Sequence, residues 1–188
     1  MTKQKIVVGA LAAAVTVAVG VACSDDFPSL SAKAPAKEFF TAALSPANER
    51  PNPVTGVNSS GQSDITIIDS VTIRVETRVS TIDSVTQAHI HEGDANTAGP
   101  VRVFLLPNNT QGRAPITGTD RTLSVVDILA TSPVCTSSAG ANTPCFLSGT
   151  GQWDFKTLVT NIRNGTAYVN VHTKRFPSGE IRGQITPK

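Results

Sequence analysis

The stretch Val71-Thr72-Ile73-Arg74-Val75-Glu76-Thr77-Arg78-Val79 decides the fold class of this chain. In an extended strand, side chains i and i+2 point to the same side, so a period of two separates the two faces. One face of this stretch carries Val71, Ile73, Val75 and Val79, and the other carries Thr72, Arg74, Glu76 and Arg78. The pattern predicts an antiparallel strand with one face in the core and the other in water.

More runs of this kind follow along the chain, and clusters of Gly, Pro and Asn separate them. The clear runs are 65–68, 85–91, 101–106, 123–129, 167–173 and 180–186, and weaker candidates are 39–44 and 151–155. Many short strands with such punctuation predict an all-β protein, a Greek-key-like antiparallel β-sandwich or barrel. One short helix is expected over 156–164, because Leu158, Val159 and Ile162 would form one apolar stripe and Gly165 suits a C-terminal cap.

A short sequence repeat marks two of these runs. Ile68-Asp69-Ser70-Val71-Thr72 recurs as Ile82-Asp83-Ser84-Val85-Thr86. The interval is too short for a repeat architecture. We interpret the two copies as the starts of adjacent strands, which could pair as a hairpin.

The N-terminus has the features of an export signal. Lys3 and Lys5 precede an uncharged apolar run over 6–21, which is short for a spanning helix of roughly 20 residues. The run ends at Val19-Gly20-Val21-Ala22-Cys23, which resembles the lipobox of bacterial lipoproteins, although that pattern prefers an aliphatic residue in place of Gly20. The resemblance implies removal of residues 1–22 and lipidation of Cys23, which would anchor the protein to a membrane of the cell envelope, in the periplasm or at the cell surface. Ordinary cleavage nearby, which would release a secreted protein, is the alternative.

The rest of the chain divides into a linker and one domain. Residues 23–37 are polar, small and punctuated by proline, so a flexible tether is expected there. Residues 38–188 have the length of a single domain. Removing the two lysines of residues 1–22 from the 16 basic residues leaves 14, which equals the number of acidic residues. A neutral chain without a basic cluster gives no electrostatic footprint for nucleic acid, so no such partner is expected.

Two cysteines remain in the predicted domain, Cys135 and Cys145. Export to an oxidising compartment would allow them to form a disulfide. The alternative, a metal site built on the two thiolates, does not match a standard ligand spacing. We therefore expect a disulfide between Cys135 and Cys145.

The chain has three histidines, and all of them lie in two of the predicted strands. His89 and His91 share one face of the first strand, and His172 shares one face of the second with Tyr168 and Asn170. If the two strands lie side by side, three imidazoles converge, and neutral imidazole is a good ligand for copper and zinc. The alternative is structural, with buried imidazoles that hydrogen-bond to neighbouring groups and pin the two strands together.

Polar side chains near the histidines could orient the imidazoles through hydrogen bonds. The candidates are Glu92, Asp94, Asn170 and Arg182. Glu180, Arg182 and Gln184 alternate along one strand and therefore share a face. They form either a polar network that supports the histidines or a solvated outer face. We favour the solvated face for Gln184, and both interpretations stay open for Arg182.

Three segments resemble the CHRD domain family, a module first described in the animal protein chordin. They are Phe40-Thr41-Ala42-Ala43-Leu44-Ser45 with Asn48-Glu49-Arg50-Pro51, Ala88-His89-Ile90-His91-Glu92-Gly93 with Gly99-Pro100-Val101, and Tyr168-Val169-Asn170-Val171-His172-Thr173 with Pro177-Ser178-Gly179-Glu180-Ile181-Arg182-Gly183-Gln184-Ile185. The likeness covers residues 38–186 and preserves order and spacing. It implies a single all-β domain, often secreted and, in bacteria, often lipid-anchored. It implies little about activity.

A weaker resemblance links the His-x-His pair and the distant third histidine to the copper site of Cu/Zn superoxide dismutases. That pattern includes a fourth histidine that bridges copper to zinc, and this chain has no fourth histidine. The sequence also lacks the nucleophile elbow of serine hydrolases and a phosphate-binding glycine loop, so an enzyme is less expected than a binding protein. Two functions remain open. One is a binding or structural module of the cell envelope, and the other is a mononuclear copper or zinc protein that uses His89, His91 and His172.

Overall fold

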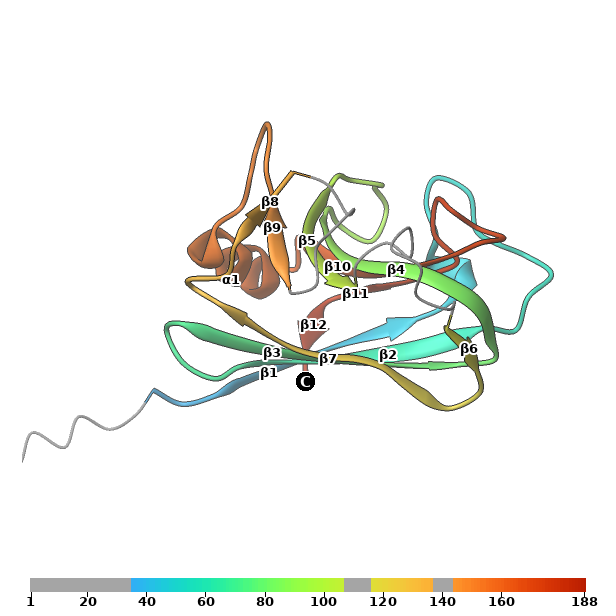
Figure 1. Cartoon of the computed structure of the whole chain (residues 1–188), viewed down its shortest axis with the longest axis horizontal. Coiled ribbons are helices and arrows are strands. Elements are labelled where there is room, and N and C mark those ends of the chain that lie inside the picture. The colour runs from blue at the N-terminus through green and yellow to red at the C-terminus, as the bar shows by residue number, and fades with distance from the viewer. Residues whose placement is uncertain (1–34, 107–115, 137–143) are drawn as a thin grey trace, which may run out of the picture. The chain divides into compact units, whose positions relative to one another are not determined.

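The computed structural model of the chain describes residues 35–106, 116–136 and 144–188. Two β-sheets lie one above the other, and one short helix, α1 (Phe155–Asn164), packs at one end of the upper layer (Figure 1). The expected all-β sandwich is therefore confirmed. The predicted signal (1–22), Cys23 and residues 24–34 of the predicted tether lie outside the described residues. Within the described part of the chain, no helix has the length and hydropathy that crossing a bilayer requires.

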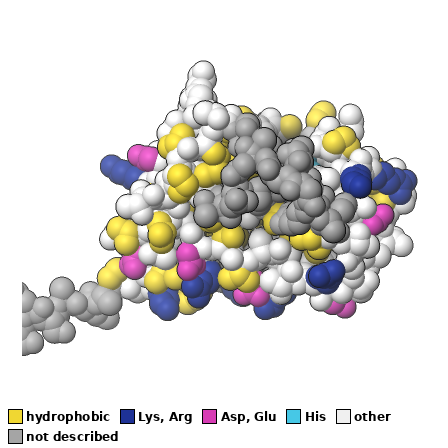
Figure 2. Space-filling view, viewed as in Figure 1, with side chains coloured by type: hydrophobic (Ala, Val, Ile, Leu, Met, Phe, Trp, Pro, Cys, Tyr) yellow, Lys and Arg dark blue, Asp and Glu magenta, His cyan; other side chains and the backbone are white. Residues whose placement is uncertain are grey.

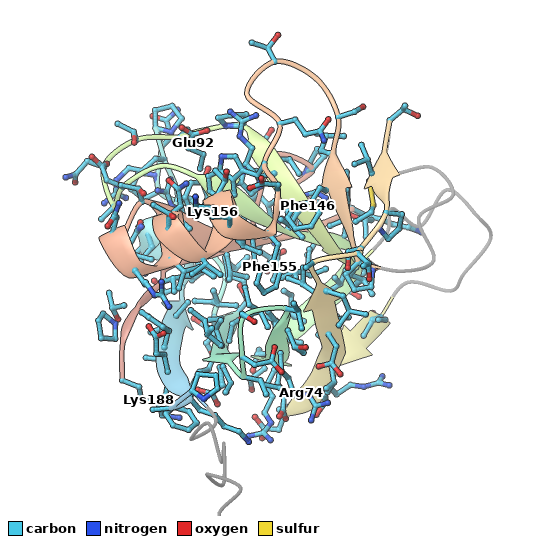
Figure 3. All side chains as sticks on the ribbon, turned by 90° about the vertical axis from the view of Figure 1, so that its left-hand side faces the viewer. Arg74, Glu92, Phe146, Phe155, Lys156 and Lys188 are labelled. Atoms are coloured by element: carbon cyan, nitrogen blue, oxygen red, sulfur yellow. A yellow bond between two sulfur atoms is a disulfide. The ribbon has the colours of Figure 1, made fainter. Side chains whose placement is uncertain are left out.

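In the described part of the chain the first sheet has five strands, each antiparallel to its neighbours. In spatial order they are β12 (Thr186–Pro187), β1 (Glu38–Leu44), β2 (Ser60–Ile67), β3 (Thr72–Ser80) and β7 (Arg121–Leu129). Its outer face carries ion pairs between Arg74 and Asp127 at 2.7 Å and between Lys188 and Asp64 at 3.0 Å. The exposed apolar side chains of Phe39, Val125 and Leu129 lie on the same face. Basic and acidic side chains are interleaved along the lower edge of Figure 2, and Arg74 and Lys188 lie on the same side in Figure 3.

The second sheet carries the histidines and has seven strands within the described residues. In spatial order they are β11 (Ile181–Gln184), β10 (Ala167–Thr173), β4 (Ile82–Glu92), β5 (Val101–Leu106), β9 (Cys145–Leu147) and β8 (Val134–Cys135), and β6 (Ile116–Gly118) pairs with β4. Only β8 and β9 pair in parallel among these described strands. All seven residues of β10 are buried, so this sheet is covered on both faces at its centre.

Strand β3 shows the predicted alternation, with one correction. Ile73, Val75 and Val79 are buried between the sheets. Thr77 points inward as well, and its hydroxyl shares a 2.8 Å hydrogen bond with the hydroxyl of Ser63. Val71 was expected on the core face, but 51% of its surface is exposed because β3 begins only at Thr72.

The two copies of Ile-Asp-Ser-Val-Thr do not form a hairpin. The first copy leads into β3 and the second begins β4, and these two strands belong to different sheets. The chain changes sheet at Thr81, whose φ of 51° turns the backbone sharply between them. Strand β3 pairs with β2 and β7, whereas β4 pairs with β5 and β10. The hairpin interpretation is therefore wrong.

The core between the sheets extends under α1, which begins one residue before the expected start and ends at Asn164 as expected. The carboxylate of Asp154 accepts a hydrogen bond of 2.7 Å from the backbone N–H of Thr157 and caps the helix. Gly165 ends it in the left-handed conformation, with φ of 67°. Leu158 and Ile162 are fully buried beneath the helix. The expected helix is confirmed.

Two expected strands differ from those in the structure. The weak candidate at 151–155 is wrong, because it forms a turn that leads into α1. Its apolar residues Trp153 and Phe155 are buried in the core, and Figure 3 labels Phe155 at the start of the helix. The run at 180–186 divides at Ile185 into two strands, because β11 pairs with β10 and β12 pairs with β1. The chain therefore crosses from one sheet to the other within this run.

The expected disulfide is confirmed. Cys135 in β8 and Cys145 in β9 are joined, and their Cα atoms lie 5.9 Å apart. The bond closes the segment between these two short strands of the second sheet. It is the kind of crosslink expected in a protein that folds in an oxidising compartment.

The placement of β3 can be tested by comparing how much Val75 and Val71 each contribute to stability. Val75→Ala is expected to lower the free energy of unfolding by about 2 kcal/mol, because it removes fully buried methyl groups and leaves a cavity. Val71→Ala is the matched control, and its effect should stay within about 0.5 kcal/mol because the side chain is exposed. Urea unfolding of both variants measures the difference. Equal losses at the two positions would contradict the register of β3.

Candidate metal centre

The three histidines meet on the outer face of the second sheet. Strands β4 and β10 pair antiparallel, so that His89 lies opposite Asn170 and His91 lies opposite Tyr168. His172 follows two positions after Asn170, so its side chain points to the same face. The ligand atoms that the three imidazoles offer all lie within 4.8 Å of one another. The predicted convergence of the two strands is therefore present in the fold.

Backbone carbonyls fix the orientation of two of the imidazoles. Nδ1 of His91 lies 2.9 Å from the carbonyl oxygen of Gly99, and Nδ1 of His172 lies 3.0 Å from that of Pro177. A carbonyl oxygen can only accept, so each of these Nδ1 atoms carries the proton. In the neutral ring, Nε2 then keeps its lone pair. Both rings are thus in the tautomer that can bind a metal through Nε2.

The third imidazole faces this pair. Nδ1 of His89 lies 3.2 Å from Nε2 of His172, and the edge of its ring packs against Phe104 with ring centroids 4.6 Å apart. Nε2 of His89 and Nε2 of His91 are buried and have no hydrogen-bond partner among the described residues. A buried nitrogen without a partner costs about 1–3 kcal/mol. The cluster therefore holds polar atoms that its described surroundings leave unsatisfied.

The spacing of these atoms resembles that of ligands around one ion. Two nitrogens bound tetrahedrally to a metal at about 2.05 Å lie about 3.3 Å apart. The 3.2 Å between Nδ1 of His89 and Nε2 of His172 is close to this value. Across the whole cluster the spread reaches up to 4.8 Å, so completing a coordination sphere needs ring movements on the order of 1 Å. His89 can offer Nδ1, the atom beside His172, and His91 and His172 can offer Nε2. Because Nε2 of His172 keeps its lone pair, Nδ1 of His89 donates the hydrogen bond between these two rings, and His89 binds an ion through Nδ1 only after its proton has moved to Nε2.

Burial keeps all three imidazoles in the neutral form that metals require. Desolvation lowers the pKa of His89 well below its ordinary value, and the neighbouring histidines lower it further. Desolvation also lowers the pKa of His91 to about 4, although its bond to Gly99 acts in the opposite direction. The pKa of His172 is lowered by burial as well, against the effect of the Pro177 carbonyl. At neutral pH none of the rings has to lose a proton from its acidic form before it can bind a cation.

The side chains predicted to orient the imidazoles lie nearby but make other contacts. Glu92 forms an ion pair with Arg102 at 2.6 Å, and Asn170 donates hydrogen bonds to Glu49 at 3.0 and 3.1 Å. Asp94 accepts hydrogen bonds within its own turn, from Asn96 and Thr97. Sequence reasoning missed the groups that do orient the rings, because every residue has a carbonyl and no side-chain pattern marks those of Gly99 and Pro177.

The face shared by Glu180, Arg182 and Gln184 is largely covered, with Gln184 half-buried at its end. Arg182 is 2% exposed and Glu180 is 4% exposed. Nε2 of Gln184 donates to the carbonyl oxygens of Gly93, Gly165 and Ala167 at 2.8–3.0 Å. The solvated interpretation of Gln184 is therefore wrong. The face is covered by loops that need hydrogen-bond donors.

Glu49 is a buried carboxyl group that sequence reasoning did not single out. It is 4% exposed and accepts both hydrogen bonds from the amide of Asn170, whose own Oδ1 is buried without a partner among the described residues. Burial raises the pKa of Glu49 to about 7, against the opposing effects of Asn170, Arg182 and Arg50. At neutral pH this group is close to half protonated.

The titration of Glu49 predicts a pH dependence of stability. Because its pKa is higher in the folded state than its ordinary value of 4.5, its stabilising effect is complete below pH 4.5 and is lost as the pH rises through 7. Over this range the wild type should lose about 3 kcal/mol relative to Glu49→Gln, which cannot titrate. Urea unfolding at pH 4.5, 6 and 8 with a chelator present measures this difference, and Glu76→Gln on the first sheet is the control. A difference that does not change with pH would contradict the buried position of Glu49.

Comparison with known proteins identifies the family. The family model described as CHRD domain matches residues 40–185, which is most of the chain. No curated protein matches, and no solved structure matches. The matched region begins in β1, ends at Ile185 and includes all three histidines. The chain belongs to the CHRD domain family.

Proposed function

We propose that this CHRD domain binds one copper or zinc ion through His89, His91 and His172. Three buried imidazoles converge on one point, and Nε2 of His91, one of the three proposed ligand atoms, has no partner in the described part of the chain. Imidazole nitrogen suits both metals, and three histidines with one open position are a known ligand set. The neutral state of the rings favours binding at physiological pH.

A purely structural role explains less of the geometry. Structural histidines would satisfy both ring nitrogens, because a buried polar atom without a partner is costly. The bonds to Gly99 and Pro177 satisfy one nitrogen each on His91 and His172. The other nitrogen of His172 lies 3.2 Å from Nδ1 of His89, whereas that of His91 has no partner among the described residues, and an ion in the cluster would provide one. The unpartnered Nε2 of His91 is the observation that carries the proposal.

Metal titration of protein purified without a histidine tag tests this proposal. One equivalent of Zn²⁺ or Cu²⁺ is expected to bind and to raise the melting temperature, because the ion binds only the folded state. His91→Ala should abolish stoichiometric binding. Glu92→Gln is the matched control, because Glu92 adjoins His91 in sequence but pairs with Arg102, and it should leave the stoichiometry at one. A wild-type protein whose melting temperature ignores both metals would remove the metal proposal.

We also propose that the protein is exported and lipid-anchored, and that it serves as a binding or structural module of the cell envelope. The charged start, the apolar run and the lipobox-like end of residues 1–23 support export and lipidation. The disulfide between Cys135 and Cys145 is compatible with an oxidising compartment. Membership of the CHRD family is compatible with an extracellular domain. A metal site and an envelope role do not exclude each other.

Lipid attachment can be tested at Cys23. In a bacterial host, Cys23→Ser is expected to abolish labelling by radioactive palmitate and to shift the protein from the membrane fraction to the soluble fraction, because one residue provides the acyl attachment. Cys135→Ser is the control and should keep both the label and the membrane association. Unchanged labelling of Cys23→Ser would contradict lipidation at this position.

A further inference from the structure

One loop supplies the carbonyl that orients His91. Residues 93–100 connect β4 to β5, and Gly99 within them accepts the hydrogen bond from Nδ1 of His91. The backbone N–H of Glu92 donates to Pro100 and that of Gly93 donates to Thr166, so both ends of the loop are joined to the sheet. The position of the Gly99 carbonyl therefore depends on how the rest of the loop is held.

Three side chains from the outer face of the second sheet hold this loop, and we call Tyr168, Arg182 and Gln184 the loop clamp. Gln184 donates to the carbonyl of Gly93 at 3.0 Å. Arg182 donates through Nη2 to the carbonyls of Asp94 and Thr97. Together these two side chains fasten the first half of the loop.

Tyr168 holds the second half of the loop at the residue that contacts His91. Its hydroxyl accepts a hydrogen bond from the backbone N–H of Gly99 at 3.0 Å and lies 3.3 Å from the Gly99 carbonyl oxygen. That same carbonyl accepts the hydrogen bond from Nδ1 of His91. Tyr168 is 2% exposed, so water does not compete effectively for these bonds. The hydroxyl thus acts directly on the group that orients the imidazole.

The ring of Tyr168 contacts both the guanidinium group of Arg182 and the imidazole of His91. The guanidinium carbon of Arg182 lies 3.5 Å from the ring centroid of Tyr168, a cation–π contact. The rings of Tyr168 and His91 are nearly parallel, with an interplanar angle of 17° and centroids 4.9 Å apart. The hydrogen bond to Gly99 therefore restricts rotation of the imidazole within its own plane, and the phenol ring of Tyr168 restricts its tilt.

The loop lies too close to the strand for side chains at two positions. A Cβ atom on Gly99 would stand 1.7 Å from the carbonyl oxygen of Glu92. A Cβ atom on Gly93 would stand 3.1 Å from Cε1 of Tyr168, and Gly93 has φ of 143°. Glycine at these positions allows the loop to approach the clamp closely enough for the hydrogen bonds to form.

We infer that Tyr168 is a positioning residue for His91, and that it sets the affinity of the metal centre by holding the Gly99 carbonyl, with Arg182 and Gln184 securing the loop. The effect on metal affinity rests on the proposed function. The effect on His91 itself does not, because the hydrogen bond to Gly99 exists without an ion. Tests in the metal-free and the metal-loaded protein therefore separate the two proposals.

Tyr168→Phe removes the hydroxyl and keeps the ring. In a competition titration with a chromophoric chelator, Zn²⁺ is expected to bind about 10- to 100-fold more weakly, the usual loss when a partner of a ligand is removed. Arg182→Lys keeps the charge but loses the planar stack and the paired carbonyl bonds, and it should weaken binding in the same direction. The control is Thr77→Val, which removes a buried hydroxyl bond in the first sheet and should leave Zn²⁺ affinity unchanged.

The tautomer of His91 gives the readout that does not require a metal. In ¹⁵N-labelled metal-free protein, long-range ¹H–¹⁵N spectra should show His91 protonated at Nδ1 in the wild type and as a mixture of tautomers in Tyr168→Phe. His172, held by Pro177, is the internal control and should not change. Unaltered His91 signals in both Tyr168→Phe and Arg182→Lys would overturn the inference, even if the wild type binds zinc. A wild type that binds no zinc but shows the tautomer change would overturn only the proposed function.

Discussion

The antiparallel register between β4 and β10 is the constraint on which the site depends. It places His89 opposite Asn170 and His91 opposite Tyr168, and it directs all of these side chains to one face. Because side chains alternate along a strand, a shift of one residue in either strand would turn its polar residues into the core and its apolar residues outward. Burial of Ala88, Ile90, Val169 and Val171 between the sheets opposes such a shift. The same hydrophobic packing that forms the sandwich therefore brings the imidazoles together.

The second sheet is unusual in that its polar face is buried as well. Asn170, His172 and Arg182 are each at most 5% exposed, because loops lie over them. Loops expose backbone carbonyls, and carbonyls away from water need donors. Arg182, Gln184 and the imidazoles provide those donors. The metal site and the attachment of the loops are consequently built from one hydrogen-bond network, in which the cluster keeps lone pairs where an ion would lie.

The sequence predicts the strands and the histidine cluster because both depend on local alternation. A period of two identifies β3, β4 and β10, and the restriction of histidine to two strands indicates their convergence. What could not be predicted depends on contacts between distant loops and the sheet. Glu49 meets Asn170 across 121 positions, and Gln184 meets Gly93 across 91. A polar residue in an alternating strand has the same pattern whether water or a loop covers it, which is why the sequence favours a solvated face for Gln184.

A crystal structure of the protein grown with zinc, with an anomalous difference map at the zinc absorption edge, would locate a bound ion directly. We expect one strong peak per chain within bonding distance of Nδ1 of His89 and Nε2 of His91 and His172, with Nδ1 of His91 still bound to Gly99. A map with no peak among these three rings, or with zinc bound elsewhere while the rings bond only to one another, would contradict this expectation.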